Sequence, residues 1–130
     1  MDKKTMNVFA ERVEQKEKRR AETKEFELGG IKLKFVKPSQ KEQLSIYGSM
    51  SEVNGAAELV ELSTALIYDC CPDLQDTELH KMLGVTDPYD VVRKLLDVHE
   101  IDVLGGRLMG WIGLLPQEAK EKIEDMAKNS

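Results

Sequence analysis

The sequence predicts a mostly helical α+β fold, in which one β-hairpin (about residues 25–37) packs on a small bundle of four to five helices behind a charged helical arm. Two runs of alternating apolar and charged residues flank Gly29-Gly30, the pattern of a two-residue hairpin. After the hairpin, apolar residues recur at helical spacing. The first 24 residues carry many charges and few apolar side chains, as expected of a solvated arm.

Length and charge limit the possible classes of protein. A chain of 130 residues is long enough to bury one core. Residues 1–25 carry eight positive and six negative charges, whereas the whole chain has a net charge of -5. The body is therefore acidic and repels phosphate, so nucleic-acid binding through the basic arm is only an alternative. No apolar run approaches the roughly 20 residues of a membrane span, and no secretory signal begins the chain, which predicts a cytoplasmic protein without membrane contact.

The arm, residues 1–24, has one short apolar stripe. Its members recur at helical spacing and are Met6, Phe9 and Val13. A Glu14–Lys18 pair at i, i+4 supports a helix, but almost no apolar residue follows the stripe before the hairpin. We therefore expect a helix that is mobile in isolation or orders on a partner.

The hairpin presents one apolar face and one charged face. Glutamates of the first strand oppose lysines of the second. Because two strands alone are unstable, helices must cover the apolar face. That face comprises Phe26, Leu28, Ile31, Leu33 and Phe35.

The next two predicted helices are separated by Asn54-Gly55. Ser39 with Glu42 forms the capping-box pattern and begins a helix that runs to about Met50. The second helix ends at Pro72. Its apolar stripe is Leu59, Leu62, Leu66, Ile67 and Cys70.

Two shorter helices follow. Asp76 or Thr77 caps the first, which Gly84 ends; its inward residues are Leu79, Met82 and Leu83. Asp87 caps the second, residues 88–98, with Pro88 at its first position. The apolar set of this helix is Val91, Val92, Leu95 and Leu96.

The C-terminal part continues a helical period. Four glycines weaken this period and predict a loose or kinked helix. Its apolar residues are Ile101, Leu104, Leu108, Trp111, Ile112 and Leu115. Residues 116–130 predict a short, frayed amphipathic helix carrying Ala119, Ile123 and Met126. The expected organisation is an arm (1–24), one globular domain (25–115) and this tail (116–130).

The stretch YDCCPDLQDTELH is the strongest candidate for chemistry, but its spacing argues against a metal or redox site. Adjacent Cys70 and Cys71 point in different directions on a helix, and neither C-x-x-C nor a convergent histidine pair is present. GGRLMGWIG lacks the Lys-Ser or Lys-Thr of a phosphate-binding loop. We predict buried thiols, no catalytic residue, no cofactor and no metal, and hence no enzyme.

Candidate partner-binding residues fall in two groups. The first is the arm stripe, Met6, Phe9 and Val13. The second is the densest apolar cluster of the chain, which is a partner site if exposed and core if buried. Its candidate residues are Leu108, Trp111, Ile112 and Leu115.

Residues 26 to about 98 resemble the XkdN-like tail assembly chaperones of Gram-positive phages and prophages. Three groups of residues carry the resemblance: Phe35 and Pro38; Tyr68, Pro72 and Leu74; and Gly84, Val85, Asp87, Pro88, Tyr89 and Asp90. The resemblance implies a non-enzymatic protein of the bacterial cytoplasm that binds the tape-measure protein and keeps it soluble until tube subunits polymerise around it. It further implies that the chaperone is absent from the finished tail. The tube protein is a second candidate partner, and a homo-oligomer is left open.

Overall fold

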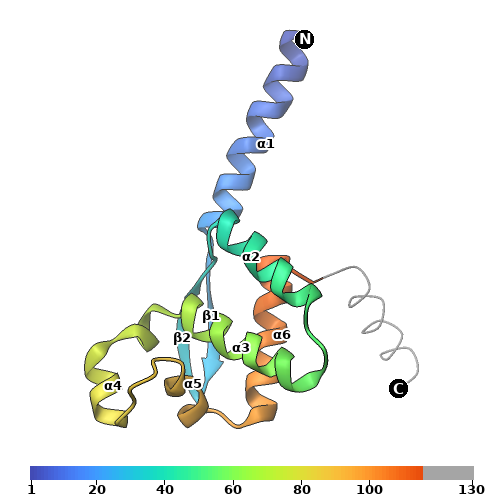
Figure 1. Cartoon of the computed structure of the whole chain (residues 1–130). Coiled ribbons are helices and arrows are strands. Elements are labelled where there is room, and N and C mark those ends of the chain that lie inside the picture. The colour runs from blue at the N-terminus through green and yellow to red at the C-terminus, as the bar shows by residue number, and fades with distance from the viewer. Residues whose placement is uncertain (116–130) are drawn as a thin grey trace, which may run out of the picture.

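The computed structural model describes residues 1–115, which form six α-helices, one 3-10 helix and one two-stranded antiparallel sheet (Figure 1). This is the mostly helical α+β fold that the sequence predicts. The predicted tail, 116–130 with Ala119, Ile123 and Met126, lies outside the described residues. In chain order the elements are α1 (Lys3–Ala21), β1 (Thr23–Leu28), β2 (Ile31–Val36), α2 (Gln40–Ser51), α3 (Ala56–Cys70), the 3-10 helix η1 (Pro72–Gln75), α4 (Thr77–Leu83), α5 (Asp90–Leu95) and α6 (Val98–Ile112).

Helix α1 projects from the body as a single straight arm (Figure 1). Asp2 caps it by accepting a hydrogen bond of 2.7 Å from the Thr5 N–H. The predicted Glu14–Lys18 ion pair is present, at 3.4 Å between Oε1 and Nζ. No residue of α1 is buried. The arm therefore contributes nothing to the core of the body, and its helical form rests on local interactions.

The hairpin has the predicted turn and cross-strand pairing. Gly29 and Gly30 have φ of +59° and +87°, two positive values in succession that glycine adopts without steric cost. The register places Glu25 opposite Lys34 and Glu27 opposite Lys32, which confirms the charged face. One residue of the predicted apolar face differs: Ile31, which pairs with buried Leu28 at the turn end of the hairpin, is 64% exposed.

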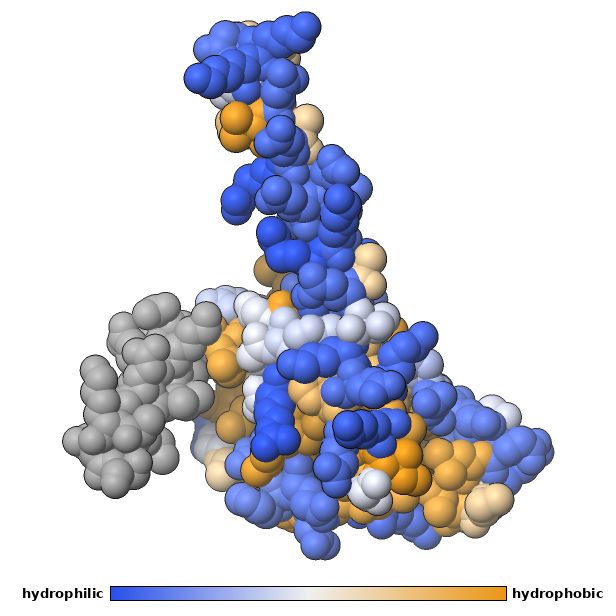
Figure 2. Space-filling model, turned by 180° about the vertical axis from the view of Figure 1, so that it is seen from behind, coloured by the Kyte–Doolittle hydropathy of each residue, from blue (hydrophilic) through white to orange (hydrophobic). Residues whose placement is uncertain are grey.

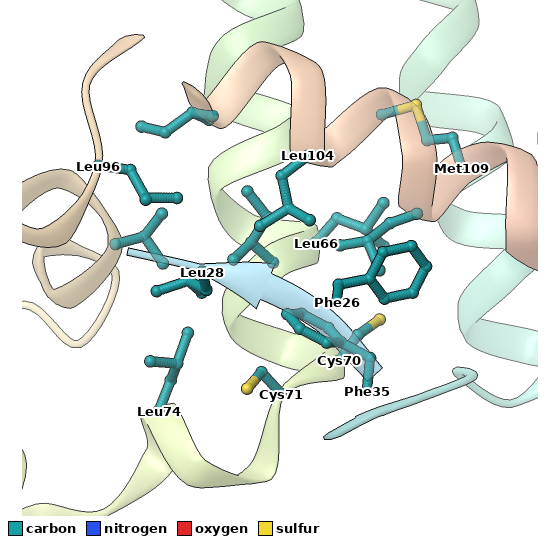
Figure 3. Close-up of a cluster of buried hydrophobic side chains, with 14 of the residues drawn as sticks. Phe26, Leu28, Phe35, Leu66, Cys70, Cys71, Leu74, Leu96, Leu104 and Met109 are labelled. Carbon is teal, nitrogen blue, oxygen red and sulfur yellow. The ribbon is translucent and has the colours of Figure 1, made fainter. Parts of the chain in front are cut away.

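Helices α3 and α6 pack against each other and, with the hairpin, enclose the core (Figures 1 and 3). The segment predicted to be a loose or kinked helix forms one continuous helix, α6, from Val98 to Ile112. Gly105 instead provides a close approach, because a Cβ at this position would overlap the Cβ and Oγ of buried Ser63 on α3. The main core residues are Phe26, Leu28, Phe35, Leu66, Ile67, Cys70, Leu74, Val91, Val92, Leu104 and Leu108.

The short helices α4 and α5 depart from prediction in two places. Met82 was expected to point inward but is 83% exposed, whereas Leu79 and Leu83 are partly buried and pack against the core. Helix α5 begins at Asp90 rather than at residue 88 and ends at Leu95. The Asp87 carboxylate accepts from the Tyr89 N–H, and this local turn occupies the expected first helical positions. Leu95 also points partly outward, with 38% exposure.

The residues predicted to cap the starts of α2 and α4 do so, with one difference in hydrogen bonding at α2. Ser39 Oγ accepts from the Glu42 N–H at 3.2 Å, but the Glu42 carboxylate accepts from the Ser39 hydroxyl instead of its backbone N–H. The reciprocal capping box occurs at α6, between Asp97 and Glu100. Asp76 is the N-cap of α4, and Gly84 ends that helix in the left-handed conformation.

Candidate interaction surfaces

The two cysteines are packing residues. Cys70 ends α3 and Cys71 follows it, and both are free thiols buried beside Phe35 and Leu74 (Figure 3). Burial raises the pKa of Cys70 to about 12 and raises that of Cys71 as well. Each thiol therefore keeps its proton at neutral pH and is a poor nucleophile or metal ligand. Within residues 1–115, no three His, Cys, Asp or Glu side chains gather closely enough to hold a metal ion.

The polar side chains near the cysteines serve to connect helices. His80 Nε2 lies 2.9 Å from the Leu74 carbonyl oxygen and 3.5 Å from the Tyr68 hydroxyl. Because a carbonyl can only accept, Nε2 carries the hydrogen and donates to it. The Tyr89 hydroxyl donates to the Asp69 carboxylate at 3.2 Å. These contacts fix η1, α4 and the entry to α5 against the end of α3.

The predicted C-terminal cluster is mostly core. Leu108 is fully buried and Ile112 is 8% exposed, so neither presents a surface to a partner, which corrects the prediction that they bind one. Leu115 is half-buried and packs at the core's edge. Trp111 is also half-buried, with its ring centroid 5.7 Å from that of Phe26 and 5.2 Å from Lys37 Nζ. Partner binding by Trp111 and Leu115 stays a prediction.

The arm stripe is exposed. Met6, Phe9 and Val13 are 50%, 53% and 56% exposed, and Val8, on another face of α1, is 55% exposed. Figure 2 shows the arm as mostly hydrophilic, with small hydrophobic areas along its length. These side chains are available to a partner because the body does not cover them.

A second exposed apolar surface lies on α2, where sequence reasoning did not place one. Leu44 is 73% and Tyr47 is 50% exposed, and together with Leu114 they line an open hollow of about 420 Å³. Ile46 and Met50, on another face of α2, pack against the core. The sequence does contain a signal for this surface. Apolar residues occupy two faces of one short helix, whereas a helix at the edge of a core needs only one apolar face.

Positive charge gathers at the base of the arm. A hollow of about 530 Å³ lies between the end of α1, the start of α2 and the end of α6. Lys16 Nζ donates to Gln40 Oε1 at 2.8 Å, and Lys37 Nζ donates to the Arg19 carbonyl oxygen at 2.9 Å. The sequence predicted no contact between this part of the arm and the body, because it lacks apolar residues; polar contacts provide the connection. The cations that line the hollow are Lys16, Arg19, Arg20 and Lys37.

Comparison with protein-family models, with curated proteins and with solved structures finds no match to this chain. Among the helices of residues 1–115, none has the length and apolar character that crossing a membrane requires. The function is therefore argued from the exposed surfaces and from the resemblance of residues 26 to about 98.

Proposed function

We propose that this protein is a phage or prophage tail assembly chaperone that binds the tape-measure protein and keeps it soluble in the bacterial cytoplasm during tail morphogenesis. It acts without catalysis and is released before the tail is complete. The tube protein is a second candidate partner, because release coincides with its polymerisation. The resemblance of residues 26 to about 98 to XkdN-like chaperones motivates the choice of partner.

The observation that supports a binding role is the exposed apolar stripe on the projecting arm. Met6, Phe9 and Val13 are each about half exposed and follow one face of α1. Full burial of one such side chain contributes about 1.5–3 kcal/mol, and association itself costs several kcal/mol. A stripe of three residues therefore gives weak, reversible binding, which suits a chaperone that must release its substrate.

Co-expression with a helical fragment of the tape-measure protein from the same prophage tests the proposal. We expect the wild-type chain to hold the fragment in the soluble fraction and to co-purify with it. The triple variant Met6→Gln/Phe9→Gln/Val13→Gln should lose both effects, because its stripe no longer removes apolar surface from water. A fragment that neither binds the wild-type chain nor becomes more soluble with it would contradict the proposal.

A matched control separates the stripe from the rest of the arm. Glu11→Gln/Gln15→Glu changes two exposed residues on the opposite face of α1 and preserves the net charge. This variant should hold the fragment as the wild-type chain does. Equal loss in both variants would mean that the effect comes from the helix as a whole.

A regulatory or interaction module that uses the basic arm is the second candidate function. The four cations at the base of the arm favour it, because such a cluster can contact phosphates. The measurement is binding to a nucleic acid at two salt concentrations. Affinity that falls steeply with salt, without any effect on the tape-measure fragment, would favour this function over the chaperone.

A further inference from the structure

The hollow at the base of the arm and the hollow on α2 adjoin each other. Both are lined by Gln40 and Gln43, so they meet at the first turns of α2. One half carries the four cations described above, and the other carries Leu44, Tyr47 and Leu114. We call this surface the α2 groove.

The two halves of the groove suit different chemistry. Leu44 and Tyr47 are the most exposed apolar side chains of α2, and they gain free energy only when another apolar surface covers them. The cations of the other half are paired with few carboxylates; Lys37 contacts Glu22 at 3.6 Å. An occupant that is apolar along one side and acidic along the next would complement both halves at once.

Nucleic acid fits this arrangement less well. A phosphate backbone would pair with the cations of one half of the groove. In the other half, it would either leave Leu44 and Tyr47 exposed to water or cover them with charged groups, and neither arrangement is favourable. Binding of single-stranded nucleic acid uses free aromatic faces for base stacking. The Trp111 ring is already engaged by Phe26 and by Lys37, so Tyr47 is the one exposed ring that lines the groove, and a single ring cannot stack successive bases.

We infer that the α2 groove binds an amphipathic α-helix of the tape-measure protein, with the helix's apolar stripe on Leu44 and Tyr47 and its acidic flank on Arg19 and Arg20. This inference rests on the proposed function for the identity of the partner. It adds a second, charge-selective surface to the arm stripe. Selectivity then comes from the groove, because the arm stripe contains no charge and would accept any apolar helix.

The test uses the full chain and two designed helical peptides of equal length and identical leucine stripe. One peptide carries glutamates along the flank of the stripe, and the other carries lysines there. We expect the glutamate peptide to bind at least roughly tenfold more tightly than the lysine peptide, measured by fluorescence anisotropy. Equal affinity for the two peptides would overturn the inference.

Variants locate the site. Leu44→Gln/Tyr47→Gln should weaken the glutamate peptide roughly tenfold or more, because it removes the apolar contact. Arg19→Glu/Arg20→Glu should reverse the preference, so that the lysine peptide binds more tightly. Met82→Gln, at a residue that is 83% exposed on α4 and outside the groove, is the matched control and should bind both peptides as the wild-type chain does.

Other results would distinguish an acidic amphipathic helix from other occupants of the α2 groove, and failure of the groove from failure of the proposed function. Tighter binding of a single-stranded oligonucleotide than of either peptide would overturn it in favour of nucleic acid. Self-association that Leu44→Gln abolishes would assign the groove to a second copy of the chain and would also overturn it. Peptide selectivity without any effect on the tape-measure fragment would refute the proposed function alone. A soluble fragment without peptide selectivity would refute the groove alone.

Discussion

At the residue scale, Gly105 is the point where α6 comes closest to its neighbour. A Cβ there would overlap the side chain of Ser63 and lie 3.2 Å from its Cα, and Ser63 is itself 1% exposed. Since neither helix can move without disturbing the core, Gly105→Ala should lower the free energy of unfolding by about 1–3 kcal/mol. Urea denaturation measures this change.

The neighbouring residue gives the control. A Cβ on Gly106 would meet no atom within 4 Å, and Gly106 lies in the same helix. Gly106→Ala should therefore raise the free energy of unfolding by up to about 1 kcal/mol through helix propensity alone. If both substitutions stabilise the protein, the close contact between α3 and α6 is not as the structure places it.

The buried thiols predict a pH dependence of stability. Burial raises the pKa of Cys70 from 9.0 to about 12, so the folded chain keeps a proton that the unfolded chain loses. Above pH 9 the unfolded state binds fewer protons, and the free energy of unfolding falls as pH rises. Stability should thus be fully present below about pH 8 and decline from pH 9 upward, as urea denaturation at several pH values would show.

Cys70→Ala separates this thiol from other groups that titrate at alkaline pH. The variant should be less stable at pH 7, because a buried sulfur is replaced by a cavity. Its stability should nevertheless fall less steeply between pH 8 and 10. The tyrosines Tyr68 and Tyr89 have raised pKa values too, but they start from 10.0 and contribute mainly above that range. Parallel curves for the variant and the wild-type chain would contradict a protonated thiol.

At the element scale, the hairpin turn depends on backbone conformation alone. A Cβ on Gly29 would meet no atom within 4 Å, but φ is +59°, which costs a β-branched residue about 1–3 kcal/mol. Gly29→Val should therefore destabilise the protein by about this amount. Gly29→Asn should change stability little, because asparagine tolerates this conformation and Asn-Gly is a favoured pair in two-residue turns. Thermal unfolding of both variants decides, and equal destabilisation would refute a purely conformational cause.

Local patterns determined most elements of the fold, and long-range packing determined the rest. Turns and helix ends were predictable where each depends on a few neighbouring residues. Examples are the hairpin turn at Gly29-Gly30, the start of α2 after Ser39, the break before α3 at Gly55 and the end of α4 at Gly84. The packing role of Gly105 was not predictable, because only the structure shows Ser63 opposite it. Helix propensity alone does not reveal where a neighbouring helix needs space.

At the scale of the whole molecule, the division between core and surface was predictable only in part. The arm stripe is exposed as expected of a segment without neighbours, but the cluster around Trp111 divides into buried Leu108 and Ile112 and half-buried Trp111 and Leu115. The sequence shows that both groups are apolar, but it does not show which of their side chains the helices cover. The α2 groove was not predicted, because it joins residues from α1, α2 and the end of α6 that are distant in sequence.

Removing the arm tests this division directly. Helix α1 has no buried residue, and its connections to the body are the polar contacts of Lys16 and Lys37 near its end. A chain that begins at Glu22 should therefore keep the unfolding midpoint of the full chain within a few degrees, because exposed polar contacts contribute little. It should at the same time lose the solubilisation of the tape-measure fragment, since the stripe is gone. Phe35→Ala in the full chain is the opposite control: it removes a fully buried ring and should lower the free energy of unfolding by about 3–5 kcal/mol.

Two results would contradict this division between arm and body. A shortened chain that unfolds as readily as Phe35→Ala would show that the arm supports the fold. A shortened chain that still holds the fragment in solution would show that the body alone binds it.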